Sequence, residues 1–259
     1  VGSEMCIRDS DSEVVATNDT DGNISLDEPR ERTLRVTHIV GERYGALFGT
    51  YFNRDDQGRI IHEMSQGYPR PSLNTSRKIL GFGVPPQQLG IGASFRYKDW
   101  NASFLVEGKS GAQVFSGTNV RLIGYGLHQM TVPSGGREAG FVPDGVLEDG
   151  TPITQSLDYT QQQNYWGRYN DVAEAGIYDS DYFRMRQMSV GYTFPKTMLE
   201  GTFIQSASVS LIGKNLFFIH NSVPNVDPES AYNNSNSQGL EFAGMPVPTT
   251  VGINVNLKF

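Results

Sequence analysis

The chain has 259 residues, a formal net charge of −7 and a pI near 5.1. Without a cluster of Lys and Arg, this acidic balance argues against nucleic-acid binding, because phosphate binding needs a basic face. The single Cys6 excludes an intramolecular disulfide framework and a cysteine-rich metal site. The longest apolar cluster, NLFFI, is far shorter than the roughly 18 residues of a transmembrane helix. Transmembrane β-strands stay possible, because each needs only about 10 alternating residues.

The N-terminal stretch contains two segments that we set apart from the rest. Residues 1–10, VGSEMCIRDS, lack the basic and apolar regions of a secretory signal and resemble translated adapter sequence, so we expect them to be non-native. At 17–28, TNDTDGNISLDE has the spacing of a calcium loop, but Thr17 stands at the first ligand position. A polar hairpin tip is the favoured interpretation, and calcium binding there is left open.

Short runs of alternating apolar and polar residues, separated by Gly- and Pro-rich turns, predict an all-β protein. We expect three hairpins. The first joins YGALFGTYFNR to RIIHEM through DDQG, and the second joins GIGASFRYK to WNASFLVEG around Lys98-Asp99. The third joins YFRMRQMSVGYTF to IQSASVSLIGKNLFF, with a β-bulge near Arg186-Gln187 because Phe183 and Met185 change parity with Met188.

Long polar stretches at 66–89, 110–180 and 220–249 separate these hairpins. With strands running up and down, every long loop falls at one end and every short turn at the other. This asymmetry is typical of outer-membrane β-barrels, and aromatics near the short turns fit an interfacial girdle. A soluble β-sandwich that binds glycans on the same loops is the alternative.

The loop segment NYWGRYND…IYDSDYF concentrates aromatic and charged residues that suit capture of a sugar or a peptide. The candidate substrate-binding residues are Tyr165, Trp166, Tyr169, Asp179, Asp181 and Arg184. Packing of these residues within the loop itself is the other interpretation. The four histidines are scattered and no catalytic or phosphate-loop motif is complete, so we expect no catalytic residues, no metal, no cofactor and no enzyme activity.

Several segments together resemble SusC/RagA-type TonB-dependent outer-membrane proteins of Bacteroidota: GERYGALFGTYFNRDDQGRIIHE, SFLVEGKSGAQVFSGTN, YFRMRQMSVGYTFPKTML, SVSLIGKNLFFI, PNVDPE and QGLEFAGMPVPTTVGINVNLKF. The resemblance runs in order over about residues 33–259. It implies that 11–259 is the C-terminal part, about seven or eight antiparallel strands, of a 22-stranded barrel whose plug domain is absent here.

The resemblance also implies a function and partners. The family imports large nutrients, typically oligosaccharides or peptides, across the outer membrane. Its partners are a SusD-like surface lipoprotein, TonB with ExbB and ExbD acting through the missing N-terminal part, the barrel-assembly machinery and outer-membrane lipid. Polar strand residues would face the lumen, among them Arg96, Asn101, Ser103, Ser208, Ser210, Asn254 and Asn256.

The tail VGINVNLKF alternates strictly, with Val251, Ile253, Val255, Leu257 and Phe259 on one face. An alternating strand that ends in an aromatic residue is expected, by the same resemblance, to be the signal read by the barrel-assembly machinery. Val251, Ile253, Val255 and Leu257 would face lipid, and Phe259 would anchor at the periplasmic interface.

Overall fold

The computed structural model describes residues 24–27, 33–136, 138, 140–230 and 238–259. The segment expected to be non-native, 1–10, lies outside them. Of the candidate calcium loop at 17–28, only Ile24–Asp27 is described, as a strand.

The described strands are β1 (Ile24–Asp27), β2 (Leu34–His38), β3 (Ala46–Phe52), β4 (Ile61–Ser65), β5 (Tyr68–Pro71), β6 (Leu73–Phe82), β7 (Gln87–Tyr97), β8 (Trp100–Ser110), β9 (Gln113–Ser116), β10 (Val146–Leu147), β11 (Ile177–Asp179), β12 (Tyr182–Thr193), β13 (Ser206–Asn221), β14 (Leu240–Glu241) and β15 (Thr250–Lys258). The α-helices are α2 (Gly117–Gly124), α3 (Tyr159–Gly167) and α4 (Lys196–Leu199), and the 3₁₀ turns are η1 (Gln129–Thr131), η2 (Arg168–Asp171) and η3 (Glu174–Gly176). Strand is the main secondary structure, as the sequence predicts.

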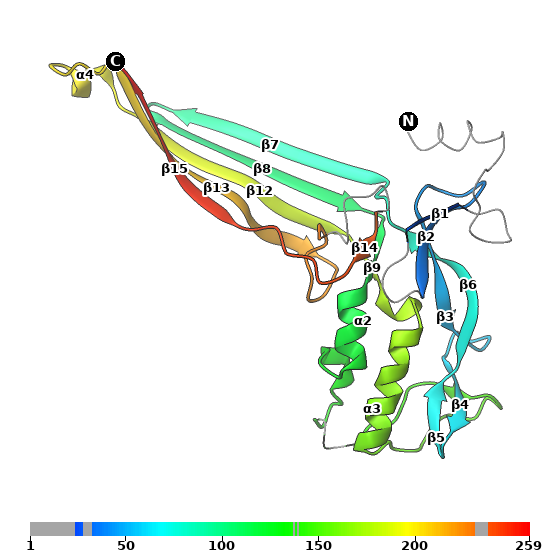
Figure 1. Ribbon diagram of the computed structural model, residues 1–259. Coiled ribbons are helices and arrows are strands. Elements are labelled where there is room, and N and C mark those ends of the chain that lie inside the picture. Colours follow the sequence, from blue (N-terminus) through cyan, green and yellow to red (C-terminus); the bar gives the residue numbers. More distant parts are fainter. Residues whose placement is uncertain (1–23, 28–32, 137, 139, 231–237) are drawn as a thin grey trace.

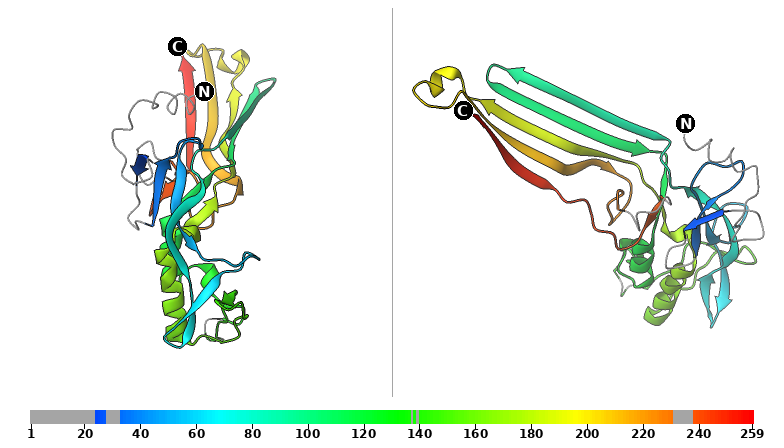
Figure 2. Two further views of the ribbon diagram at one scale, coloured as in Figure 1. Left: turned by 90° about the vertical axis from the view of Figure 1, so that its right-hand side faces the viewer. Right: turned by 45° about the horizontal axis from the view of Figure 1, so that its top comes forward.

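Five long strands form one antiparallel sheet, in the order β15-β13-β12-β8-β7 (Figure 1). The sheet extends away from a compact part of the molecule that contains β1–β6, β9, β14, α2 and α3 (Figure 2). Short connections and α4 lie at the far end of the sheet, whereas the long insertions lie at the compact end. The expected asymmetry of loops is therefore present.

Two predicted hairpins of the long sheet are confirmed in register. β7 and β8 close with Tyr97 opposite Trp100, and Lys98 takes a φ of +53° in the two-residue turn between them. β12 pairs with β13, and its register shifts between Met185 and Gln187, where the bulge is expected. The extra residue keeps Met185 and Met188 on the same face of the sheet, although their sequence parity differs.

The register sorts side chains onto two chemically different faces. On one face the apolar positions of all five strands adjoin, and most of them are exposed; they are Ile91, Phe95, Tyr97, Trp100, Phe104, Met188, Val190, Val209, Leu211, Val251, Ile253, Val255 and Leu257. On the other face Ser103 Oγ lies 2.8 Å from Ser189 Oγ, and Asn254 and Asn256 lie opposite Ser210 and Ser208. The predicted division of the strands into an apolar and a polar face is confirmed.

Other expectations are corrected by the structure. Gly58 does take a positive φ of +81° in the DDQG turn, but the strands on either side share only the bridge between Arg54 and Ile60. β3 pairs with β2 and β6, while β4 pairs with β5 and β10, so the first hairpin opens into two sheets. The stretches at 66–89 and 110–180 are not simple loops, because the former contains β5 and β6 and the latter α2 and α3.

The compact part has its own core. One cluster of buried residues contains Phe52, Tyr68, Ile123, Leu157, Tyr165, Trp166, Tyr169 and Val172, and a second contains Leu34, Val36, Leu47, Phe115, Val120, Ala173 and Leu240. Both clusters join residues far apart in sequence, so they fix the helices against the small sheets. None of the helices in the described ranges is long and apolar enough to cross a membrane.

Candidate functional site

The three predicted aromatic residues lie together in α3 and η2. Asp158 begins α3 with a capping box, since its carboxylate accepts from the Gln161 N–H and the Gln161 side chain accepts from the Asp158 N–H. α3 turns Tyr165 and Trp166 into the core and η2 turns Tyr169 there, so the three residues expose 2%, 6% and 7% of their surfaces. The three rings pack against one another in tilted and edge-to-face arrangements, with ring centroids 5.0–5.9 Å apart. The rings also pack on residues of other elements, such as Phe52 and Tyr68, and their part in substrate binding stays a prediction.

Tyr165 also contacts a buried histidine from another strand. The rings of Tyr165 and His62 are nearly parallel, and the Tyr165 hydroxyl lies 3.2 Å from His62 Nε2. Burial lowers the pKa of His62, so this ring is neutral at pH 7. The pair links α3 to β4 rather than presenting a group to solvent.

The two predicted aspartates hold strand ends. Asp181 accepts hydrogen bonds from the Ser110 hydroxyl at 2.8 Å and the Gly111 N–H at 2.7 Å, where β8 ends. Asp179 accepts from Gln113 Nε2 at 3.2 Å. These hydrogen bonds are to other groups of the protein, at the point where the long sheet meets the compact part.

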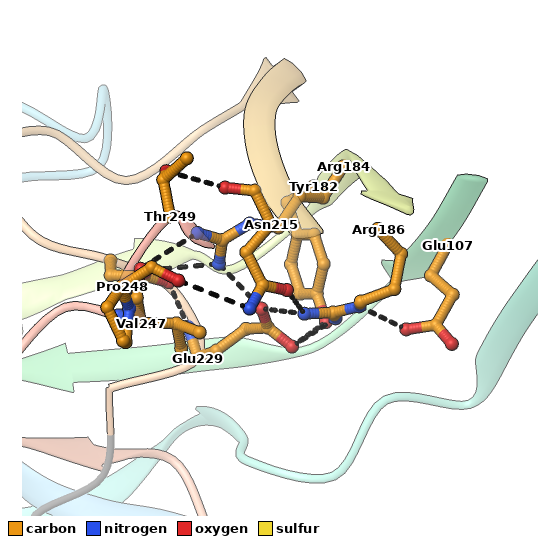
Figure 3. Close-up of polar contacts among 10 residues, drawn as sticks. Glu107, Tyr182, Arg184, Arg186, Asn215, Glu229, Val247, Pro248 and Thr249 are labelled. Carbon is orange, nitrogen blue, oxygen red and sulfur yellow. Dashed lines mark hydrogen bonds and ion pairs between the residues drawn. The ribbon is translucent and has the colours of Figure 1, made fainter. Parts of the chain in front are cut away.

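Arg184, the sixth predicted residue, is the centre of a buried ionic cluster at the compact end of β12 (Figure 3). Its Nη1 lies 3.2 Å from Asp227 Oδ2 and 2.8 Å from Glu229 Oε2, and its Nη2 donates to the Val247 carbonyl at 3.2 Å. The guanidinium carbon lies 4.4 Å from the centre of the Phe218 ring. The cluster thus ties β12 and β13 to the loops that follow β13 and β14.

Arg186 extends the cluster toward β8. Its guanidinium bonds Glu229 Oε1 and Glu107 Oε2 at 2.6 Å each, and donates to Asn215 Oδ1 at 2.8 Å. The Tyr182 hydroxyl donates to Glu229 Oε1 at 2.8 Å. Glu229 therefore accepts from three side chains of one strand, as Figure 3 shows.

These contacts set the ionisation of Glu229. Burial of the carboxyl raises its pKa, but hydrogen bonds from Arg186, Tyr182 and Arg184 outweigh the burial and lower the pKa to about 2. Asp227 accepts from the backbone N–H groups of Glu229 and Val247, so the second carboxylate of the cluster is also held by donors.

The low pKa of Glu229 predicts an acid-sensitive attachment of its loop. Because the folded-state pKa lies below the ordinary glutamate pKa of 4.5, the stabilisation is complete above about pH 4.5 and is lost as the pH falls through about 2. The melting temperature of the full-length protein in detergent, measured from pH 7 to pH 2, should fall in this window. Glu229→Gln should lower the melting temperature at pH 7 and flatten its fall in acid. An equally steep fall in this variant would contradict the assignment.

Two neighbouring cavities open beside α2 and α3. The larger, of about 820 Å³, is lined by Gly124, Tyr125, Gly126, Thr131, Glu138, Gly140, Leu157, Asp158, Tyr159, Gln162, Gln163 and Trp166. The smaller, of about 460 Å³, is lined by Gln66, Tyr68, Arg70, Gly124, Tyr125, Gln163, Asn164, Gly167, Arg168, Asn170 and Asp171. Of the six predicted residues, Trp166 alone lines either of these two cavities.

Sequence reasoning missed most of this lining because it missed the helices. The capping box Asp158-x-x-Gln161 and the N-cap Ser116, which accepts from the Asn119 N–H, are the signals that mark α3 and α2. Arg70 lies on β5, inside a stretch interpreted as loop. Across the residues described, no three His, Cys, Asp or Glu side chains converge in a way that could hold a metal ion.

The chain is similar to known proteins in both sequence and fold. The TonB-dependent receptor P3 of Formosa agariphila is 25% identical over 189 residues, which are 71% of this chain and 17% of that protein. The RagAB peptide importer in its "closed-closed" state matches 92% of this chain with a TM-score of 0.59 and 12% identity. The resemblance to SusC/RagA-type TonB-dependent proteins is confirmed. The "open-open" state of RagAB matches 91% of the chain with a TM-score of 0.56 and 13% identity.

The matched proteins are much longer than this chain. It spans about a sixth of the P3 receptor, at 17%, and 24–25% of the matched RagAB chains. No family model matches the chain. The solved structures, at 12–13% identity, bear on the fold.

The SusC/RagA-like motifs coincide with the ionic cluster. PNVDPE supplies both Asp227 and Glu229, and GKNLF supplies Asn215, which accepts from Arg186. YFRMRQMSVGYTFPK contains Arg184, Arg186 and the bulge. The motifs therefore build the junction between the long sheet and the compact part.

Proposed function

We propose that this chain is part of an outer-membrane TonB-dependent nutrient importer of a Gram-negative, Bacteroidota-like bacterium. The observation that carries the proposal is the register of the long sheet, which places an exposed apolar face across five strands and polar residues behind it. Water disfavours an apolar surface of this extent, whereas lipid accommodates it. The alternative, a soluble glycan-binding β-sandwich, would cover that face with a second sheet.

In the proposed protein, β7, β8, β12, β13 and β15 belong to a 22-stranded barrel, and the compact part lies on its extracellular side. A SusD-like surface lipoprotein, TonB with ExbB and ExbD, and the barrel-assembly machinery are the proposed partners. The proposed nutrient is an oligosaccharide or a peptide, and we propose that the protein has no enzyme activity. We further propose that Asp179, Asp181 and Arg184 hold the loops that face the nutrient, and that the small exposed part of Trp166, which lines the larger cavity, contacts it.

The proposal is tested on the full-length gene product in a Bacteroidota host. The protein should sediment with outer membranes and need detergent for extraction, and its deletion should abolish uptake of the nutrient that supports growth. Recovery of the full-length protein in the soluble fraction without detergent would contradict the proposal and favour the sandwich.

A related prediction concerns Phe259, which stacks on Phe203 of the β12–β13 connection with ring centroids 5.6 Å apart. We propose that the alternating strand β15 with Phe259 is read by the barrel-assembly machinery. Phe259→Asp should then lower the outer-membrane level of the full-length protein and increase its periplasmic degradation, while Phe259→Tyr should be nearly silent. Phe203→Ala removes the stacking partner alone, and should spare the membrane level if Phe259 acts during assembly. A wild-type level for Phe259→Asp would refute this role.

A further inference from the structure

The two cavities beside α2 and α3 share a wall and carry opposite charge. Gly124, Tyr125 and Gln163 line both of them. Of the described residues, Glu138 and Asp158 are the charged ones in the larger cavity, whereas the smaller contains Arg70 and Arg168 together with Asp171. A ligand that crosses the shared wall therefore meets carboxylates on one side and two guanidinium groups on the other.

The larger cavity favours a cationic group. Among the residues that the structure describes, its lining contains two carboxylates and no Lys or Arg, and this favours an ammonium ion over an anion. The Asp158 carboxylate is held in place, because one of its oxygens accepts from the Gln161 N–H at 2.9 Å at the start of α3. A fixed carboxylate loses little conformational entropy on binding a ligand.

The smaller cavity favours an anionic group. Arg70 is bonded to the Ser65 hydroxyl at 3.2 Å, and its Nε is buried without a partner among the residues that the structure describes. Arg168 lies 3.7 Å from Glu63 and 3.5 Å from Asp171, both beyond good hydrogen-bond length. Arg70 forms no ion pair among the described residues, and the two ion pairs of Arg168 are long, so both guanidinium groups retain capacity to bind an incoming carboxylate.

The shared wall suits the chain of atoms between two such groups. Tyr125 is 73% exposed, and its ring offers an apolar surface at the boundary of the cavities. Gln163 can both donate to a carbonyl and accept from an N–H. These are the bonds that a peptide backbone needs, whereas an uncharged oligosaccharide would gain nothing from the separated charges.

We propose that the two cavities together bind a short peptide with free termini, its ammonium group beside Asp158 and Glu138 and its carboxylate beside Arg70 and Arg168. This inference rests on the proposed function and names the class of nutrient. It assigns the recognition of both ends of the ligand to residues of this chain.

The first experiment varies the ligand. Binding of a pool of unmodified peptides of four to eight residues to the detergent-extracted full-length protein is measured by calorimetry, alongside the same peptides with N-acetyl or C-amide ends. Each modification should weaken binding about tenfold, because each removes a charge-assisted hydrogen bond. Neutral hexaoses serve as the competing class. Saturable hexaose binding that Tyr125→Ala abolishes, or peptide binding insensitive to both modifications, would overturn the inference.

The second experiment links each end of the peptide to its cavity. In Asp158→Asn/Glu138→Gln, N-acetylation should cause no further loss while C-amidation still does, and Asn retains the helix cap. In Arg70→Gln/Arg168→Gln the pattern should reverse, since both guanidinium groups that bind the carboxylate are then gone. Glu148→Gln and Arg59→Gln are matched controls outside both cavities and should bind like the wild type. Equal sensitivity to both modifications in every variant would refute the assignment.

Failure here is separable from failure of the proposed function. Outer-membrane location and nutrient uptake are scored for the same protein preparations. A protein that reaches the membrane and transports, yet discriminates against no modified peptide, leaves the importer proposal standing and removes this inference.

Discussion

Arg184→Met should lower the free energy of unfolding of the full-length protein by about 3–5 kcal/mol. The side chains of Arg184 and Asp227 are only 5% and 3% exposed, so removal of the guanidinium leaves a carboxylate buried without its cation. Met preserves most of the side-chain volume, so the loss reports the ion pairs, the bond to Val247 and the cation–π contact with Phe218 rather than a cavity. Urea unfolding in detergent micelles, followed by loss of resistance to protease at the β13–β14 loop, measures the effect.

A matched surface pair provides the control for this prediction. Arg59 pairs with Asp55 at 2.7 Å four residues away, with side chains 41% and 19% exposed. Arg59→Met should cost at most about 1 kcal/mol, because water already screens an exposed pair. Arg184→Met/Asp227→Leu should recover much of the loss, since the orphaned charge is gone. No recovery in the double variant would mean that the cluster acts through shape and not through charge.

How much of the structure the sequence predicts depends on whether a feature arises from a local pattern or from contacts between distant residues. The period of two along β12 and β15, and the parity change between Met185 and Met188, are local patterns, so the strands, their faces and the bulge follow from them. The pairing of β3 with β6 rather than β4 depends on contacts between distant residues, and a turn such as DDQG specifies only the reversal of the chain.

The candidate site was harder to predict for a related reason. Aromatic residues close together in sequence suggest a ligand surface, yet the helix α3 and the turn η2 direct Tyr165, Trp166 and Tyr169 into the core. The two cavities instead combine residues from β5, α2 and α3, whose proximity no local pattern encodes. Arg184 was selected for its charge, but its buried partners lie 43 and 45 residues away in PNVDPE.

Ile253→Arg should reduce the stability of the membrane-inserted protein by about 2–4 kcal/mol, whereas Asn254→Arg should be tolerated. The two residues are neighbours on β15, but Ile253 pairs with Leu211 on the apolar face and Asn254 pairs with Ser210 on the polar face. Arginine on the former face must enter lipid, while on the latter it reaches the water of a barrel lumen. Outer-membrane level and urea unfolding in liposomes give the readout.

Two further adjacent pairs repeat the comparison on other strands. Val209→Arg and Phe104→Arg should show the same loss, and Ser208→Arg should match Asn254→Arg. Ser103→Arg carries an extra cost of about 1 kcal/mol, because it removes the hydrogen bond to Ser189. The contrast between faces is thus expected on β8, β13 and β15 alike. Equal losses on the two faces of all three strands would mean that both faces are sealed against water, and the long sheet would then be the layer of a soluble core rather than part of a membrane barrel.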